Sequence, residues 1–146
     1  MHTISISPPL GCSLSSCSSP LTNLFASGPL ATDDGGETWT VPKPLPALIG
    51  PTCQGSISGS PTHPGTVLMS APNSHDGSLG GRENLGLWAM SSKPTSMPVL
   101  VGRLWGCKGG YSAFSQDGRF NLFEAGETFR YETISLVYLN LTRSTI

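Results

Sequence analysis

The sequence predicts an all-β protein, and three observations support this class. The chain has 18 Gly and 13 Pro residues among 146, and so many turn-forming residues indicate many short connections. After residue 50, short segments alternate between apolar and polar residues, which is typical of strands. No segment of useful length follows the 3.6-residue period of a helix. Short strands with frequent turns favour a propeller or a sandwich.

The elements follow in chain order. Residues 1–30 form a Ser- and Pro-rich segment with no period of 2 or 3.6 and no charged residue, so we expect it to be irregular. Residues 31–146 form the β part. The alternation predicts strands over residues 53–58, 66–70, 84–90, 99–101, 111–115, 120–124 and 132–139. Asp117 and Gly118 predict a tight hairpin turn between two of these strands.

Composition excludes several classes of function. The formal net charge is -1 and only 12% of residues are charged, so we expect no nucleic-acid partner. No run of about 20 apolar residues could span a membrane, and the N-terminus lacks the features of a signal peptide. The spacing of the four cysteines matches no zinc site. Two alternatives stay open: a disulfide between Cys12 and Cys17, or four thiols that are buried or free. His63 and His75 lie in predicted loops with no partner at ligand spacing, so we expect neither to bind a metal. We expect no cofactor.

A dense turn begins the β part. It has the form Ser/Thr-x-Asp-x-Gly-x-Thr-Trp, filled by Thr32, Asp34, Gly36, Thr38 and Trp39. Asp34 can accept hydrogen bonds from backbone N–H groups of the turn, and Gly36 permits a positive φ. Trp39 would cover the turn with apolar surface. We therefore interpret the motif as a structural hairpin.

Beyond this turn, three residues have side chains that could take part in binding or catalysis. Arg82 precedes a predicted strand; such an arginine is ordinarily solvated or ion-paired, but its planar guanidinium also suits bidentate binding of a carboxylate. Tyr111 opens a strand after two glycines, and its ordinary role is half-buried packing. Glu124 ends a strand, where a carboxylate is ordinarily an exposed charge. Glu132 we expect to be structural or exposed.

Over about residues 30–142, the order of these motifs resembles the C-terminal part of the exo-α-sialidases (neuraminidases), animal sialidases in particular. These glycosidases are six-bladed β-propellers. The turn at Asp34 resembles their Asp box (BNR repeat), and residues 53–56, Cys-Gln-Gly-Ser, resemble a run found there. Since a blade takes about 40–50 residues, the resemblance implies a partial propeller of about three C-terminal blades.

The resemblance also implies roles for individual residues. Arg82 matches an arginine that binds the carboxylate of sialic acid. Tyr111 matches the nucleophile of a Tyr-Ser pair; a neutral tyrosine avoids the repulsion that an anionic nucleophile would meet beside that carboxylate. Glu124 matches a glutamate that holds an arginine of the site in place. The implied activity is hydrolysis of terminal sialic acids from glycoproteins, glycolipids and oligosaccharides, with the sialylated glycoconjugate as substrate.

Other parts of the sialidase site have no counterpart in this sequence. The family uses two further arginines, an Asp for acid–base help and a Glu that pairs with the tyrosine, whereas residues 1–30 hold no Arg, Lys, Asp or Glu. We therefore expect a truncated sialidase that is inactive by itself. The alternative is a non-catalytic Asp-box propeller module that binds a glycan or a protein. The family occurs in lysosomes, in the cytosol and at membranes, so compartment and oligomeric state stay open; a glycosylation sequon begins at Asn140.

Overall fold

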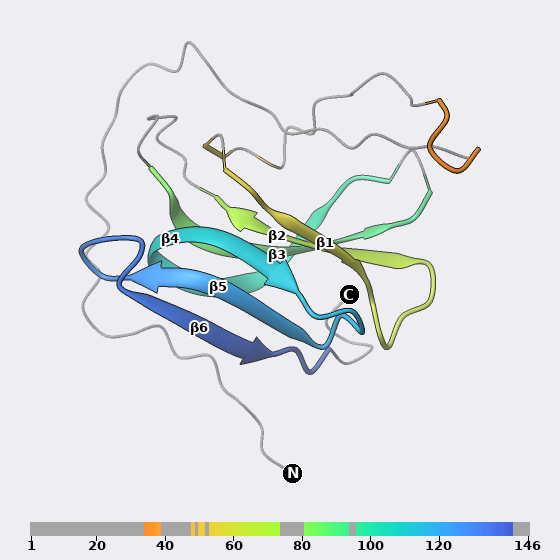
Figure 1. Ribbon diagram of the computed structural model, residues 1–146. Helices are drawn as coiled ribbons and strands as arrows, with labels where there is room; N and C mark the ends of the chain where they lie inside the picture. Colours follow the sequence, from red (N-terminus) through yellow and green to blue (C-terminus); the bar gives the residue numbers. More distant parts are fainter. Residues whose placement is uncertain are drawn as a thin grey trace.

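The computed structural model describes residues 34–38, 48, 50–51, 53–73, 81–93 and 96–141. Across these ranges the chain forms six strands and no helix, which confirms the all-β class. The strands follow one another in chain order through a single antiparallel sheet (Figure 1). They are β1 (Ser56–Gly59), β2 (Thr66–Pro72), β3 (Glu83–Ser91), β4 (Val99–Phe114), β5 (Phe120–Gly126) and β6 (Thr133–Tyr138).

Strand β4 is the main departure from the predicted elements. Residues 99–101 and 111–115 were expected to form two strands, but 99–114 form one strand of 16 residues. The four glycines between them do not break it, because the two parts of β4 have different neighbours. β4 pairs with β3 from Val99 to Lys108 and with β5 from Lys108 to Phe114. The ladder changes register beside Gly109, where the second pairing begins.

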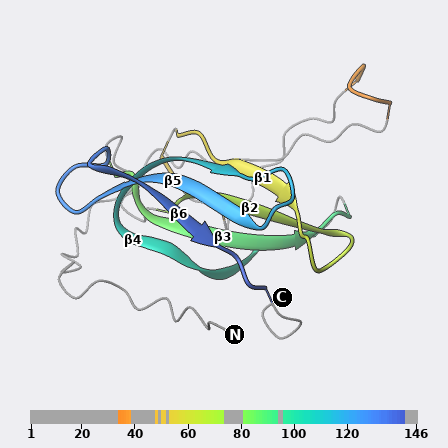
Figure 2. The same cartoon turned by 60° about the horizontal axis from the view of Figure 1, so that its bottom comes forward.

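The sheet is curled into half of a barrel (Figure 2). The curl brings β1 to the second part of β4, where the Ser56 hydroxyl oxygen accepts a hydrogen bond from the Phe114 N–H at 2.9 Å. The β4–β5 turn also lies close against the end of β1. Gly118 has a φ of 68° in this turn, and a Cβ there would collide with the Gly59 carbonyl oxygen. The Asp-Gly hairpin predicted from the sequence is therefore confirmed.

The inside of the curl holds the main hydrophobic core. β3 contributes a run of buried residues, because its two faces are both covered: Leu85 and Leu87 pack inside, and Trp88 packs on Leu48 at the outer face. Each fully buried leucine stabilises the fold by roughly 1.5–3 kcal/mol. The buried residues of the main core are Leu68, Leu85, Leu87, Ala89, Leu104, Phe123, Ala125, Leu139 and Leu141.

A small polar cluster is buried beside this core. The Ser70 and Ser112 hydroxyl groups lie 2.9 Å apart, and the Ser112 hydroxyl can also donate to the Ser70 carbonyl oxygen at 3.2 Å. The Asn121 side-chain amide donates to the Ser70 hydroxyl oxygen at 2.9 Å. These contacts join β2, β4 and β5 across the curl. They also hold Ser112 inward, so its neighbour Tyr111 points to the opposite face of β4.

The turn at Asp34 has the hydrogen bonds expected for it. Both carboxylate oxygens of Asp34 accept from the Thr38 N–H, at 3.0 and 2.9 Å, and Gly36 has a φ of 100°. Thr32, Trp39 and the expected irregular segment of residues 1–30 lie outside the described residues.

The cysteines are not all free. Cys53 is a free thiol, whereas the buried Cys107 is disulfide-bonded, so the expectation of four free or buried thiols was wrong for Cys107. Cys12 and Cys17 lie outside the described residues. Among the residues described, no helix is long and apolar enough to cross a membrane.

Candidate functional site

The structure brings Arg82, Tyr111 and Glu124 together at one end of the sheet. Arg82 lies immediately before β3, Tyr111 in β4 and Glu124 in β5. The guanidinium carbon of Arg82 lies 5.1 Å from the centroid of the Tyr111 ring, within the range of a cation–π contact. A carboxylate oxygen of Glu124, Oε2, accepts a hydrogen bond from the Tyr111 N–H at 2.9 Å. Three residues far apart in sequence therefore form one cluster.

Local backbone geometry makes this cluster possible. Side chains alternate along β4, so Tyr111 is 43% exposed while Ser112 is held in the buried polar cluster. Gly110 leaves the space that the Glu124 carboxylate occupies, because a Cβ at this position would collide with that carboxylate. The two glycines that precede Tyr111 thus allow the close approach that the sequence suggested.

Arg82 makes contacts with two tyrosines. Its Nη1 donates a hydrogen bond to the Tyr131 hydroxyl oxygen at 3.3 Å, and its guanidinium lies over Tyr111. Partial burial acts to lower the pKa of Arg82, but the hydrogen bond with the Tyr111 side chain and the nearby Cys53 thiol act to raise it. The net pKa lies above its ordinary value, so Arg82 is a permanent cation in this site.

The Cys53 thiol lies close to the same cluster. Its sulfur is 3.6 Å from the Gly110 carbonyl oxygen. Burial raises the pKa of the Cys53 thiol, while the charges of Arg82 and Arg130 lower it and that of Glu124 raises it. The net pKa is raised, so the thiol stays protonated at neutral pH. Cys53 therefore adds no charge to the site.

The loop between β5 and β6 forms one wall of the site, and a carboxylate fixes its shape. Glu132 accepts hydrogen bonds from the backbone N–H groups of residues 127, 128 and 129, at 2.9, 3.1 and 2.7 Å. These bonds lower the pKa of the Glu132 carboxyl, and the bond from the N–H of residue 127 has the largest effect. Glu132 is exposed, as expected, and its role is structural. The loop places Arg130 and Tyr131 beside Arg82, and the sequence alone assigned no role to either residue.

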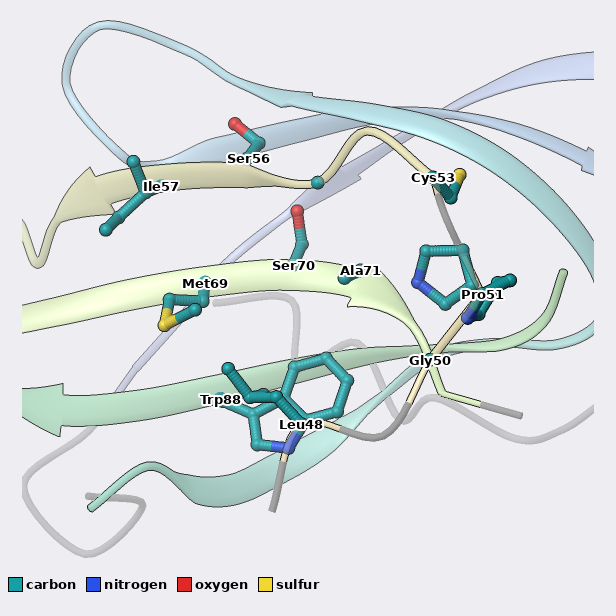
Figure 3. A pocket seen from close by; sticks show the side chains of 12 residues that line it. Leu48, Gly50, Pro51, Cys53, Ser56, Ile57, Met69, Ser70, Ala71 and Trp88 are labelled. Atoms are coloured by element: carbon teal, nitrogen blue, oxygen red, sulfur yellow. The ribbon is translucent and has the colours of Figure 1, made fainter. Parts of the chain in front are cut away.

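Two hollows lie near these residues. The smaller, of about 160 Å³, is lined by Arg82, Lys108, Thr128, Phe129 and Arg130. The larger, of about 200 Å³, is mainly apolar; Trp88 and Leu48 lie together at its base beneath Met69 of β2 (Figure 3). None of the three candidate residues lines the larger pocket. Of these three residues, Arg82 alone lines the smaller pocket, where it is joined by Lys108 and Arg130.

No group of three or more His, Cys, Asp or Glu side chains in the described part of the chain could hold a metal ion. Comparison of the chain with family models, with curated proteins and with solved structures finds no match.

Proposed function

We propose that this chain carries part of an exo-α-sialidase site, in which Arg82 binds the carboxylate of a terminal sialic acid and Tyr111 is the nucleophile. The observation that carries the proposal is the contact of Arg82 with Tyr111, at 5.1 Å from guanidinium carbon to ring centroid. A sialic acid has its carboxylate on the anomeric carbon. The group that binds the carboxylate and the group that attacks the carbon must therefore be neighbours.

The proposed chemistry follows from the charges of the site. Arg82 holds the carboxylate by charge-assisted hydrogen bonds. The Tyr111 oxygen forms a bond to the anomeric carbon as the glycosidic bond breaks, its proton passes to a base, and the leaving oxygen takes a proton from an acid. Water then attacks the anomeric carbon from the same face as the departed glycan and loses a proton, while the bond from that carbon to the Tyr111 oxygen breaks and the Tyr111 oxygen regains a proton. The two displacements together give retention of configuration.

Glu124 has a positioning role in this proposal. Its Oε2 accepts from the Tyr111 N–H, which ties the backbone of the nucleophile to β5. Within the described residues, its second oxygen, Oε1, makes no hydrogen bond and could bind another cation. This fits the proposed role of holding an arginine of the site.

The propeller fold is part of the same proposal. β1, β2, β3 and the first part of β4 make a four-stranded antiparallel unit, and the second part of β4 begins another with β5 and β6. Four-stranded antiparallel units that follow one another in the chain are what propeller blades require. In this structure the strands are joined in one continuous sheet, and Lys108 pairs with both Glu83 of β3 and Gly126 of β5. The arrangement into separate blades therefore rests on the resemblance of the sequence motifs.

A sialoside assay tests the function. The chain supplies one carboxylate-binding arginine and no assigned acid, so we expect binding of a methyl α-sialoside but no hydrolysis. A version extended upstream into further propeller blades should hydrolyse a fluorogenic sialoside, and Tyr111→Phe should abolish turnover while sialoside binding persists. Undiminished hydrolysis by the Tyr111→Phe variant would rule out the nucleophile assignment.

A non-catalytic glycan-binding module is the second candidate. The observation in its favour is that the Glu124 carboxylate binds the backbone of Tyr111 and not its hydroxyl group, so among the described residues no carboxylate is hydrogen-bonded to the phenol as a base. An extended, folded chain that binds the sialoside without cleaving it would establish this function and exclude the enzyme.

A further inference from the structure

A second guanidinium, that of Arg130, lines the same pocket as Arg82. The pocket has a volume of about 160 Å³, and three of its five lining residues are cations, with Lys108 as the third. A small pocket lined by several cations favours an anionic ligand, because a ligand anion offsets charges that are partly withdrawn from water.

The charges of these cations are not balanced in the same way. Lys108 is ion-paired with Glu83, so its charge is already matched. Arg130 is only partly exposed and has no carboxylate oxygen within 4.0 Å in the part of the chain that the structure describes. Its guanidinium carbon lies 5.5 Å from the centroid of the Tyr131 ring. Arg130 therefore brings an unmatched positive charge to the pocket.

The position of Arg130 is fixed by its loop. The Glu132 carboxylate accepts from three consecutive backbone N–H groups, those of residues 127–129, and so holds the turn that leads to Arg130. Tyr131 then links the two arginines: its ring lies under Arg130 and its hydroxyl accepts from Arg82. A guanidinium held in this way loses less conformational freedom when it binds a ligand.

We propose that the pocket between Arg82 and Arg130 binds one compact oxyanion, a carboxylate, sulfate or phosphate group, and that Arg130 is a specificity-determining residue of the site. The oxyanion lies between the two guanidinium groups, and Lys108 adds a weaker, screened attraction. The inference deepens the proposed function, because a sialic acid carboxylate is one source of the oxyanion. Arg130 favours glycans with an acidic group over neutral glycans.

The test follows the arginine side-chain Nε–Hε resonances of the full chain by NMR during titration. The probes are a methyl α-sialoside, sodium sulfate and sodium phosphate at constant ionic strength. The variants are Arg130→Gln, Arg130→Lys, Arg82→Gln and, as a matched control, Arg103→Gln, which removes an exposed arginine of β4. Backbone amide spectra establish that each variant is folded, and Arg130→Lys keeps the charge of the loop if Arg130→Gln does not fold.

We expect Arg130→Gln to weaken binding of the tightest probe by about tenfold or more, the loss of one charge-assisted contact. Arg130→Lys should lose part of that affinity, and Arg103→Gln should keep all of it. An unchanged affinity in Arg130→Gln, together with a loss in Arg82→Gln, would overturn the inference and leave the proposed function standing. An equal loss in Arg130→Gln and Arg103→Gln would also overturn it, because net charge alone would then explain the binding.

The two proposals fail in distinguishable ways. Sulfate or phosphate binding that depends on Arg130, without any sialoside binding, would support the oxyanion pocket and refute the sialidase-type function. Absence of binding by all three probes to the folded chain would refute the pocket.

Discussion

Removal of the Ser70 hydroxyl group should destabilise the protein, and the size of the effect should depend on Asn121. The Ser70 oxygen accepts the hydrogen bond from the Asn121 side-chain amide, and Asn121 is fully buried. The carbonyl oxygen of the same side chain, Oδ1, has no partner. In Ser70→Ala the whole Asn121 amide would be buried without a hydrogen bond, whereas Ser112 keeps its contact with the Ser70 backbone oxygen.

The magnitudes follow from these contacts. A buried polar group left without a partner costs about 1–3 kcal/mol, so Ser70→Ala should lower the free energy of unfolding by about 2 kcal/mol. Asn121→Leu keeps a similar volume, loses a hydrogen bond of about 1 kcal/mol and removes the unpaired carbonyl, so the net change should stay within about 1 kcal/mol. In the Asn121→Leu background, Ser70→Ala leaves no amide unpaired and should cost about 1–2 kcal/mol less.

Urea denaturation of the four proteins, followed by tryptophan fluorescence, measures this coupling. The slopes of the unfolding curves should stay the same, because the surface exposed on unfolding does not change. If Ser70→Ala costs the same in both backgrounds to within about 0.5 kcal/mol, the two side chains are independent and the polar cluster does not have the role described.

The remaining predictions concern the loop between β5 and β6, the glycine before Tyr111 and the hairpin turn. The pKa of the Glu132 carboxyl is lowered in the folded protein, so its bonds to residues 127–129 stabilise the loop above an unfolded pKa of about 4.3 and are lost as the pH falls through the lower folded pKa. Amide protection of residues 127–129 should therefore fall in acid, and in Glu132→Gln this pH dependence should disappear; a variant with the same acid response would contradict the assignment. Gly110→Ala should displace the Glu124 carboxylate, which is the flexible end of a side chain, with little effect on the free energy of unfolding. The Tyr111 amide, which donates to that carboxylate, should lose protection from hydrogen exchange; unchanged protection would show that the space at Gly110 is not needed. Gly118→Ala should lower the free energy of unfolding by about 1–2 kcal/mol, because the φ of 68° is unfavourable for alanine and the new Cβ would meet the end of β1. Thermal unfolding measures this loss of stability, and an unchanged melting temperature would contradict the observed packing.

The sequence was sufficient for features that depend on local chemistry. The all-β class and most strand positions came from alternation of apolar and polar residues, which reports which face of a strand is buried. The Asp34 turn and the Asp-Gly hairpin came from residues whose side chains or permitted φ values determine the local backbone. Arg82, Tyr111 and Glu124 could be selected as candidates because their order resembles that of a known site.

The tertiary structure decided the features that depend on neighbours distant in the chain. Whether residues 99–114 form one strand or two depends on the backbone partners on either side of β4, and glycine propensity carries no information about those partners. The approach of Glu124 to Tyr111 arises from the pairing of β4 with β5 and the register shift beside Gly109. The burial of Asn121 against Ser70 and the placement of Arg130 beside Arg82 bring together parts of the chain that are not neighbours in the sheet. The sequence therefore determined the elements and the candidate residues by local preferences, whereas the environment of the site was decided by the way in which the curled sheet brings separate strands together.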